Sequence, residues 1–361
     1  MTGSSQSRDD KNLLLIQLLR GIASLLVVYM HVTVNTKEIS HQIFLGDFFK
    51  FGGAGVDIFF VLSGFIITYT SRKGIGNPHK LLPFLRRRFV RIFPAYWIII
   101  GMFLLVQIVL PSFYKTPYNF TTGNFLSTFF LLPGHTMVNG VSWTLTSELF
   151  FYALFSLAFL IPDKKIAFSL SMLYGVMLVV IALSGYPAAN GNHWMNLAVF
   201  PMNVEFIMGV LAAAIIPSIP KSLGIPLIIT GSIIFLTSAI LSNAGFYLLA
   251  SPFNRVVIFG IPSFLLIIGL VKYELNKNIS LHNILLSLGE ASYSLYLLHL
   301  PLVVAGIRII TRFNIENNII LHGLLFLLIG IICFASILFY QWVEKPLINR
   351  LNSQHKKPVG S

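Results

Sequence analysis

The stretch LLLIQLLRGIASLLVVYMHVTV, residues 13–34, is long and apolar enough to cross a lipid bilayer as an α-helix. Nine further apolar runs follow it, so the sequence predicts an all-α integral membrane protein with about ten transmembrane helices. The apolar stretch 125–132 is too short to cross, and we expect it to lie in a loop or to re-enter. The predicted spans are 13–34, 50–70, 91–111, 146–161, 166–184, 198–216, 224–242, 253–271, 289–311 and 319–341.

The composition supports this fold class. Hydrophobic residues make up 56% of the 361 residues and charged residues only 10%, whereas soluble domains carry about 25% charged residues. A soluble fold of this size cannot bury so much apolar surface in one core. The single cysteine, Cys333, excludes an internal disulfide and a cysteine-based zinc site, and we expect no metal. The first span lacks a small-residue cleavage site and is therefore expected to be retained.

The charge distribution predicts the topology. The chain has 25 Lys and Arg against 12 Asp and Glu, a net charge of +13. Cationic residues lie in short loops between apolar runs, so we expect them to set orientation rather than to bind nucleic acid. The loop after the second span is the most basic, which predicts that this loop and both termini are cytoplasmic. The prediction is one membrane domain, residues 13–345, with cytoplasmic tails at 1–12 and 346–361.

Two ionisable side chains lie within the first span. Arg20 and His31 are eleven residues apart, about three helical turns, and therefore share a face. Ionisable groups inside a membrane bundle are functional candidates, and a neutral imidazole is suited to accept a proton from a hydroxyl. A snorkelling arginine and an interfacial histidine fit the residues equally well.

The run Arg86-Arg87-Arg88-Phe89-Val90-Arg91 precedes the third span. Arg88 and Arg91 are neighbours on a helix, and the guanidinium group is well shaped for phosphate. The residues alone favour the simpler interpretation, an anchor that sets topology, over phosphate binding.

Further polar residues lie at the ends or on the faces of other spans. Glu148 opens the fourth span, where it either orients His31 or completes a helix cap with Thr144 or Thr146. Asp57 follows a glycine-rich segment without the GxGxxG pattern of nucleotide folds. Ser292, Tyr296 and His299 share a face of the ninth span, where they line a polar cavity or bond between helices. The chain lacks HExxH, GxSxG and GxxxxGK[ST], the motifs of zincins, α/β-hydrolases and P-loop proteins.

Several stretches, taken in order, resemble the acyltransferase 3 family of membrane acyltransferases. The resemblance covers about residues 13–347, and each stretch alone is a weak signal. The matching stretches are LRGIA and YMH in the first span (19–23 and 29–31), GVDIFFVLSGF (55–65), RRFVRIFPAYW (87–97), SWTLTSE (142–148), SYSLYLLH (292–299) and EKP (344–346).

This resemblance implies a ten-helix enzyme of the bacterial cytoplasmic membrane that transfers an acyl group, usually acetyl from acetyl-CoA, to a sugar hydroxyl. The chain looks like the stand-alone type without an SGNH domain, similar to exopolysaccharide- and O-antigen-modifying members. Its expected partners are acyl-CoA, a polysaccharide or lipid-linked glycan acceptor and membrane lipids. We expect His31 and Glu148 to be catalytic; Arg20, Arg86, Arg87, Arg88 and Arg91 to bind the acyl-CoA; and Asp57, Trp143, Ser147, Tyr296 and His299 to bind substrate.

Three alternatives stay open at this point. A polysaccharide or lipid-linked sugar transporter also needs many spans and buried polar groups, although such proteins usually show internal repeats or broken helices, which the sequence lacks. A membrane scaffold would need none of the polar residues for chemistry. A relative in the same family that acts on a small glycoside would share the site residues and differ only in its acceptor.

Overall fold

The computed structural model describes residues 13–109, 118–185, 192–245 and 251–353, and all regular elements in these ranges are helical. Ten helical segments are long and apolar enough to cross a membrane, which confirms the predicted fold class and number of spans. The predicted tail 1–12 and the end of the predicted tail 346–361 lie outside the described residues.

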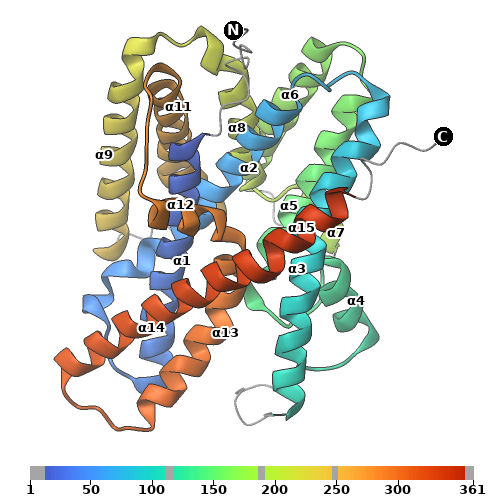
Figure 1. Cartoon of the computed structure of the whole chain (residues 1–361). Coiled ribbons are helices and arrows are strands. Elements are labelled where there is room, and N and C mark those ends of the chain that lie inside the picture. The colour runs from blue at the N-terminus through green and yellow to red at the C-terminus, as the bar shows by residue number, and fades with distance from the viewer. Residues whose placement is uncertain (1–12, 110–117, 186–191, 246–250, 354–361) are drawn as a thin grey trace, which may run out of the picture.

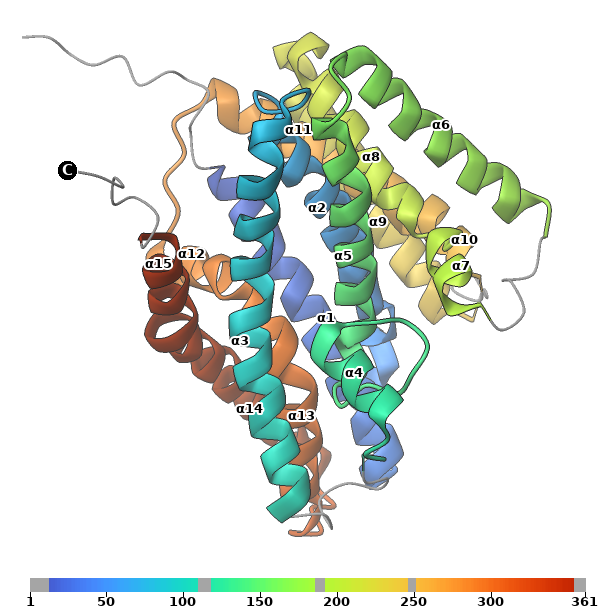
Figure 2. The same ribbon diagram turned by 90° about the vertical axis from the view of Figure 1, so that its right-hand side faces the viewer.

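The helices occur in the following order (Figures 1 and 2). They are α1 Leu14–Ser40, α2 Gly55–Ser71, α3 Leu81–Val109, α4 Thr122–Phe130, α5 Trp143–Ser156, α6 Lys164–Leu183, α7 His193–Ala198, α8 Asn203–Ile215, α9 Gly224–Asn243, α10 Pro252–Arg255, α11 Ile261–Asn276, α12 Asn283–Glu290, α13 Ser292–Thr311, α14 Asn318–Phe339 and α15 Lys345–Ser353. The stretch predicted to be too short to cross forms α4, which is not among the ten candidate spans.

Two boundaries differ from the prediction by ten residues or more. Helix α3 begins at Leu81, ten residues before the predicted third span, because the arginine run is itself helical. Helix α14 continues through a π-helical turn at Tyr340–Glu344 into α15, so the predicted C-terminal tail begins as helix. In both places a charged or polar helical segment extends an apolar one, and hydropathy alone does not detect it.

Small residues allow the central helices to approach closely. A Cβ on Gly64 of α2 would lie 2.0 Å from the carbonyl oxygen of Phe206, and one on Gly209 of α8 would lie 2.2 Å from that of Val61. Such contacts are typical of membrane helix pairs, where van der Waals packing replaces the hydrophobic effect. The α2–α8 pair therefore forms a fixed support for the side chains on the opposite face of α2.

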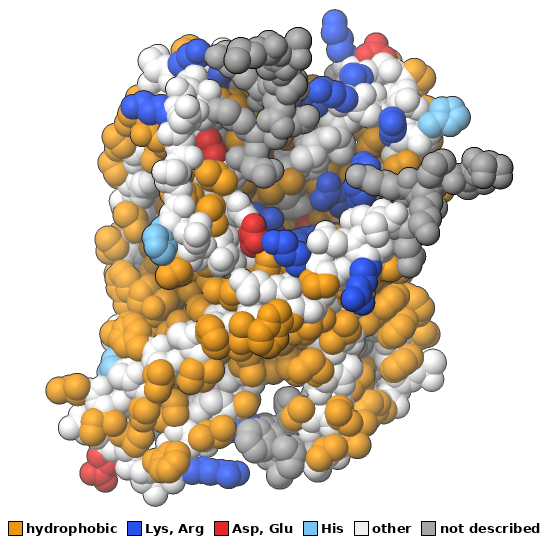
Figure 3. All heavy atoms as spheres, viewed as in Figure 1, with side chains coloured by type: hydrophobic (Ala, Val, Ile, Leu, Met, Phe, Trp, Pro, Cys, Tyr) orange, Lys and Arg blue, Asp and Glu red, His pale blue; other side chains and the backbone are white. Residues whose placement is uncertain are grey.

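Cationic side chains gather at one end of the bundle, which we call the basic end. Lys164 Nζ lies 3.2 Å from the carbonyl oxygen of Arg72, and Arg72, Lys221, Lys272 and Lys277 line one cavity there. Figure 3 shows Lys and Arg side chains concentrated in the upper part of the molecule, above a broad band of hydrophobic side chains. A band of this kind is the surface expected to contact lipid.

Candidate active site

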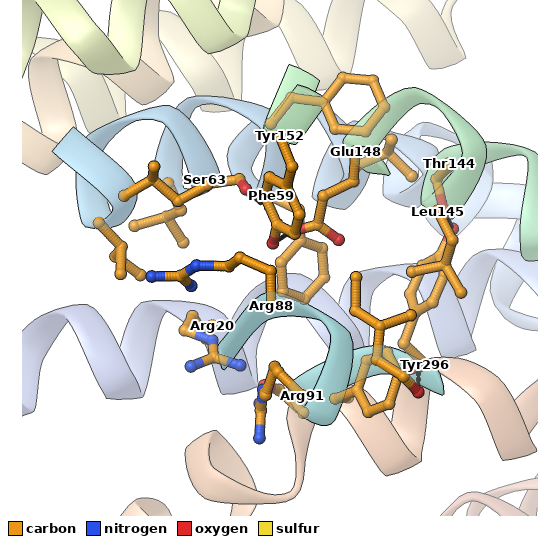
Figure 4. A pocket seen from close by; sticks show the side chains of 18 residues that line it. Arg20, Phe59, Ser63, Arg88, Arg91, Thr144, Leu145, Glu148, Tyr152 and Tyr296 are labelled. Carbon is orange, nitrogen blue, oxygen red and sulfur yellow. Dashed lines mark hydrogen bonds between the residues drawn. The ribbon is translucent and has the colours of Figure 1, made fainter. Parts of the chain in front are cut away.

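A cavity of about 130 Å³ lies between α1, α2, α3, α5 and α13, and we call it the inner cavity. Figure 4 shows its lining, with Arg20, Arg88 and Arg91 together on one side and Thr144, Leu145 and Tyr296 on the other. Three guanidinium groups in one small space create a strongly positive environment, which is suited to an anionic or thioester-bearing ligand.

Glu148 is the carboxylate that the described residues contribute to the inner cavity. Ser63 Oγ donates a hydrogen bond of 2.8 Å to its Oε1, and the Tyr152 hydroxyl donates a second. Arg88 lies over the Tyr152 ring, with its guanidinium carbon 5.6 Å from the ring centroid. Glu148 therefore faces the cavity instead of capping α5, and its negative charge opposes the three arginines.

The five arginines predicted to bind acyl-CoA separate into two groups. Arg20, Arg88 and Arg91 line the inner cavity. Arg86 instead donates from Nη2 to the carbonyl oxygen of Leu351 at 2.6 Å, and Arg87 is exposed on the surface of α3. Neither Arg86 nor Arg87 lines the cavities described here.

Arg91 is held by a buried carboxylate. Its Nη1 lies 2.7 Å from Glu344 Oε1, and Glu344 is 0% exposed. Ser294 donates to the other oxygen of the same carboxylate. The bonds fix the direction of the Arg91 side chain, so the guanidinium is already in place before any ligand arrives.

A wider cavity of about 560 Å³ opens from the inner cavity toward the basic end, and we call it the mouth cavity. The two share Arg20, Ile66 and Arg91 in their linings. The mouth cavity adds further polar side chains, namely Gln17, Tyr69, Thr70, Arg72, Lys73, Glu290 and Tyr340. A ligand entering at the basic end would therefore pass Arg72 before it reaches Arg20 and Arg91.

His31 and His299 form a hydrogen-bonded pair. His31 Nδ1 lies 3.2 Å from His299 Nε2 and 3.0 Å from the carbonyl oxygen of Val27, and His299 Nδ1 lies 3.2 Å from that of Leu295. A carbonyl oxygen can only accept a hydrogen bond, so His299 Nδ1 must carry the proton that it donates to Leu295. The lone pair of His299 is therefore on Nε2. His31 Nδ1 then carries a proton shared between Val27 and His299. The remaining lone pair of His31 is on Nε2, which makes this nitrogen available as a base.

The histidine pair lies beside the inner cavity but not in its lining. Tyr296 lines the cavity and also contacts the histidine pair. Its ring centroid is 5.7 Å from that of His299, and its hydroxyl is 2.8 Å from Oγ1 of Thr144, another residue of the cavity lining. The hydrogen bonds of Glu148 go to Ser63 and Tyr152, so the structure does not bring Glu148 to His31 as the orienting carboxylate. His299, rather than a carboxylate, is the side chain that lies within hydrogen-bond distance of His31 Nδ1.

Asp57 lies apart from the inner cavity. It is 0% exposed and forms an ion pair with Arg255, which also donates to the carbonyl oxygen of Gly53 at 2.9 Å. The Glu205 side chain is likewise 0% exposed, and a Cβ on Gly260 would lie 2.9 Å from its Oε1. Asp57 thus joins α2 to α10 and is not exposed for direct contact with a substrate.

Trp143 and Ser147 lie on the other face of α5, where they line a separate cavity of about 440 Å³ that we call the flank cavity. Trp143 is 40% exposed and meets the Phe200 ring edge-on at a centroid distance of 6.0 Å. Two buried polar atoms of the flank cavity lining, Thr146 Oγ1 and Asn196 Oδ1, have no hydrogen-bond partner among the described residues.

The sequence analysis missed two residues that line the inner cavity, Ser63 and Tyr152, and Glu344, which pairs with Arg91 of that lining. Ser63 and Glu344 lie inside stretches that carry the family resemblance, and Tyr152 follows Glu148 by four residues, so it shares a helical face with it. The motifs and the helical spacing could therefore have identified these residues from the sequence. No group of three or more His, Cys, Asp or Glu side chains able to hold a metal ion is found within the described ranges.

Comparison with known proteins identifies the family of the chain. The model of the acyltransferase domain family, acyltransferase 3, matches residues 14–340. The exopolysaccharide production protein ExoZ of Rhizobium meliloti (strain 1021) is 28% identical over 315 residues, which cover 84% of this chain and 92% of the relative. The acyltransferase MdmB of Streptomyces mycarofaciens is 25% identical over 321 residues, covering 81% and 79%.

A third relative, nodulation protein 10 of Rhizobium leguminosarum bv. viciae, is 32% identical over 120 residues, or 28% of this chain and 32% of the relative. No solved structure matches the chain. The family match covers residues 14–340, which is most of the chain. This range includes every residue that lines the inner cavity. The chain therefore belongs to the acyltransferase 3 family and is a multi-pass membrane protein.

Proposed function

We propose that the chain is an O-acyltransferase that moves an acyl group, acetyl in the simplest case, from cytoplasmic acyl-CoA to a hydroxyl of an exported polysaccharide sugar. The observation that carries this proposal is the pair of adjoining cavities that share Arg20, Ile66 and Arg91. They extend from the basic end to Tyr296, whose ring lies beside that of His299. The family match and the names of ExoZ and MdmB support the same activity.

The residues along one face of α2 support a position for the donor. Phe59 and Ser63 line the inner cavity, Ile66 lines both cavities, and Tyr69 and Arg72 line the mouth cavity. From Phe59 to Arg72 the helix rises about 20 Å. A narrow path of this length between helices suits the flexible pantetheine arm of CoA, with its phosphates at Arg72 and its thioester near Tyr296. The charges along the path at Arg20, Arg88 and Arg91 favour an anionic donor.

The orientation follows from the same charges. We place the basic end in the cytoplasm, because Lys and Arg in short loops stay on that side, and because CoA is cytosolic. Both termini would then be cytoplasmic and the membrane would be the bacterial cytoplasmic membrane. His31, about 16 Å further along α1 than Arg20, lies toward the opposite side, from which the acceptor would approach.

The reaction follows from the tautomer of the histidine pair. The sugar oxygen attacks the thioester carbonyl carbon while His31 Nε2 takes the hydroxyl proton. The C–S bond then breaks, and the thiolate of CoA leaves and takes the proton from His31 Nε2, which restores the neutral imidazole. His299 Nε2 accepts from His31 Nδ1–H, so it holds the imidazole in the basic tautomer and stabilises the imidazolium that forms. A positioned base of this kind contributes about 10²- to 10⁴-fold to the rate.

The flank cavity would be a second binding surface for the acceptor. The exposed face of Trp143 is suited to stack on a sugar ring, and Thr146 and Asn196 offer hydrogen-bonding atoms that no described residue satisfies. We assign this cavity to a sugar residue of the acceptor beside the one that is acylated.

The proposal is tested with the purified chain in lipid vesicles. Labelled acetyl-CoA is added together with polysaccharide isolated from cells of the source organism that lack this protein, and label in the polysaccharide is measured. We expect transfer by the wild type and loss of at least about 100-fold in His31→Ala, with His79→Ala, an exposed histidine, as control. Movement of glycan across the vesicle membrane without use of acetyl-CoA would instead identify a transporter.

A further inference from the structure

A second basic cavity lies beside the mouth cavity. It measures about 640 Å³, and we call it the lysine cavity after the side chains that line it, Lys221, Lys272 and Lys277, together with Arg72. No carboxylate belongs to its lining among the described residues. Four cations around one space repel one another, so an anion within it would be strongly favoured.

Lys272 is the most informative member of this group. It is only 8% exposed, and neither its Nζ nor that of Lys221 forms a hydrogen bond or ion pair with any residue in the described ranges. A lysine that only sets topology is expected to extend into solvent or toward lipid headgroups. A largely buried lysine whose ammonium faces a cavity, with no partner among the described residues, is instead a group for which a ligand supplies the counter-charge.

The lysine cavity continues the donor path. It shares Tyr69 and Arg72 with the mouth cavity, which in turn shares Arg20, Ile66 and Arg91 with the inner cavity. Three spaces thus follow one another along α2, from the histidine side to the basic end. Whatever occupies the lysine cavity would lie at the far end of a ligand whose reactive group is in the inner cavity.

We propose that the lysine cavity binds a phosphate monoester, namely the 3′-phosphate on the ribose of the CoA nucleotide. A phosphate monoester carries a charge of about −1.5 to −2 at neutral pH, more than a phosphodiester, which matches a site with several cations. The inference rests on the proposed function and adds the part of the donor that is recognised. The same cavity chemistry would fit the headgroup phosphate of an anionic lipid, and the experiment separates the two sources.

The test compares CoA with 3′-dephospho-CoA, which differ only in this phosphate. Binding to the purified chain in uncharged detergent is measured by calorimetry for the wild type and for Lys221→Gln, Lys272→Gln and the double variant. We expect the wild type to bind CoA at least about tenfold more tightly than dephospho-CoA. In the double variant CoA affinity should fall to that of dephospho-CoA, whose own affinity should not change.

Matched controls are Lys80→Gln and Lys165→Gln, which remove exposed lysines of the basic end outside the three cavities. Both should retain the preference for CoA. Because Lys272 is buried, its variant is also checked by thermal unfolding, and Lys221→Gln, at an exposed residue, gives an independent reading of the same preference.

The results separate the two proposals. Equal binding of CoA and dephospho-CoA by the wild type would overturn the phosphate site while leaving the CoA donor intact. Binding of neither compound would overturn the donor and the site together. Release of bound CoA by phosphatidylglycerol vesicles, without any preference for CoA over dephospho-CoA, would assign the cavity to a lipid headgroup and overturn the inference.

Discussion

His31 Nδ1 lies 3.2 Å from His299 Nε2, although 268 residues separate them in the chain. Because Leu295 fixes the tautomer of His299, the pair leaves a lone pair on His31 Nε2. This arrangement resembles the orienting role of a carboxylate toward a catalytic imidazole, with a neutral histidine in its place. His299 is therefore a positioning residue in the proposed reaction, and His31 is the base.

The first prediction concerns His299. His299→Ala should lower kcat about 10- to 100-fold, because a hydrogen bond to a charged group contributes about 1.5–3 kcal/mol. His299→Gln, whose amide oxygen can accept from His31 Nδ1–H, should recover part of that loss, which a purely structural role would not produce. The measurement is steady-state acetyl transfer at saturating acetyl-CoA. A wild-type rate for His299→Ala would remove His299 from the mechanism.

The second prediction concerns Glu148. Glu148→Gln keeps the shape of the side chain and removes its charge, so the inner cavity becomes more positive. We expect kcat to fall at least about tenfold, while CoA binds as well as or better than before, since the added positive charge favours an anion. Glu290→Gln is the control for kcat, because Glu290 lines the mouth cavity and not the inner cavity. Weaker CoA binding by Glu148→Gln would show that the carboxylate has a different role.

The sequence predicted the fold well because hydropathy is a local property. Each apolar run is read without knowledge of the others, so the ten spans and the short segment that became α4 follow directly. Helix α3 began earlier than predicted because Arg86–Arg91 is a charged segment that is nevertheless helical. Charge lowers the hydropathy of a segment but does not prevent a helix from forming.

The site was predicted only in part. Arg20, Arg88, Arg91, Glu148 and Tyr296 lie together around the inner cavity, but their partners depend on which helices pack side by side. Helical periodicity shows which face a residue occupies and not what that face meets. The contact between Arg91 and Glu344, 253 residues apart, and the histidine pair therefore required the tertiary structure.

The third prediction concerns the ion pair between Arg91 and Glu344. Glu344→Ala should destabilise the protein by about 3 kcal/mol, because it leaves Arg91 partly buried without its counter-charge. The double variant Arg91→Met with Glu344→Met should recover most of the stability and still bind CoA poorly, since stability needs only good packing whereas donor binding needs the guanidinium. Thermal unfolding in detergent and CoA calorimetry measure the two effects. Normal CoA binding by the double variant would exclude Arg91 from the donor site.

The fourth prediction concerns the flank cavity. Trp143→Ala should raise the KM for polysaccharide about 5- to 100-fold, because stacking on an aromatic face contributes about 1–3 kcal/mol, while the KM for acetyl-CoA stays unchanged. Thr146→Val, which removes an unpartnered hydroxyl at nearly constant volume, should raise the same KM more modestly.

Trp194 offers the matched control for this measurement. It is 58% exposed on the neighbouring helix α7 but does not line the flank cavity, so Trp194→Ala should leave both KM values unchanged. An equal rise in Trp143→Ala and Trp194→Ala would indicate a general effect on this surface. A rise in the KM for acetyl-CoA in Trp143→Ala would instead place the indole on the donor path, next to Phe60, whose ring centroid is 6.2 Å away and which lines the inner cavity.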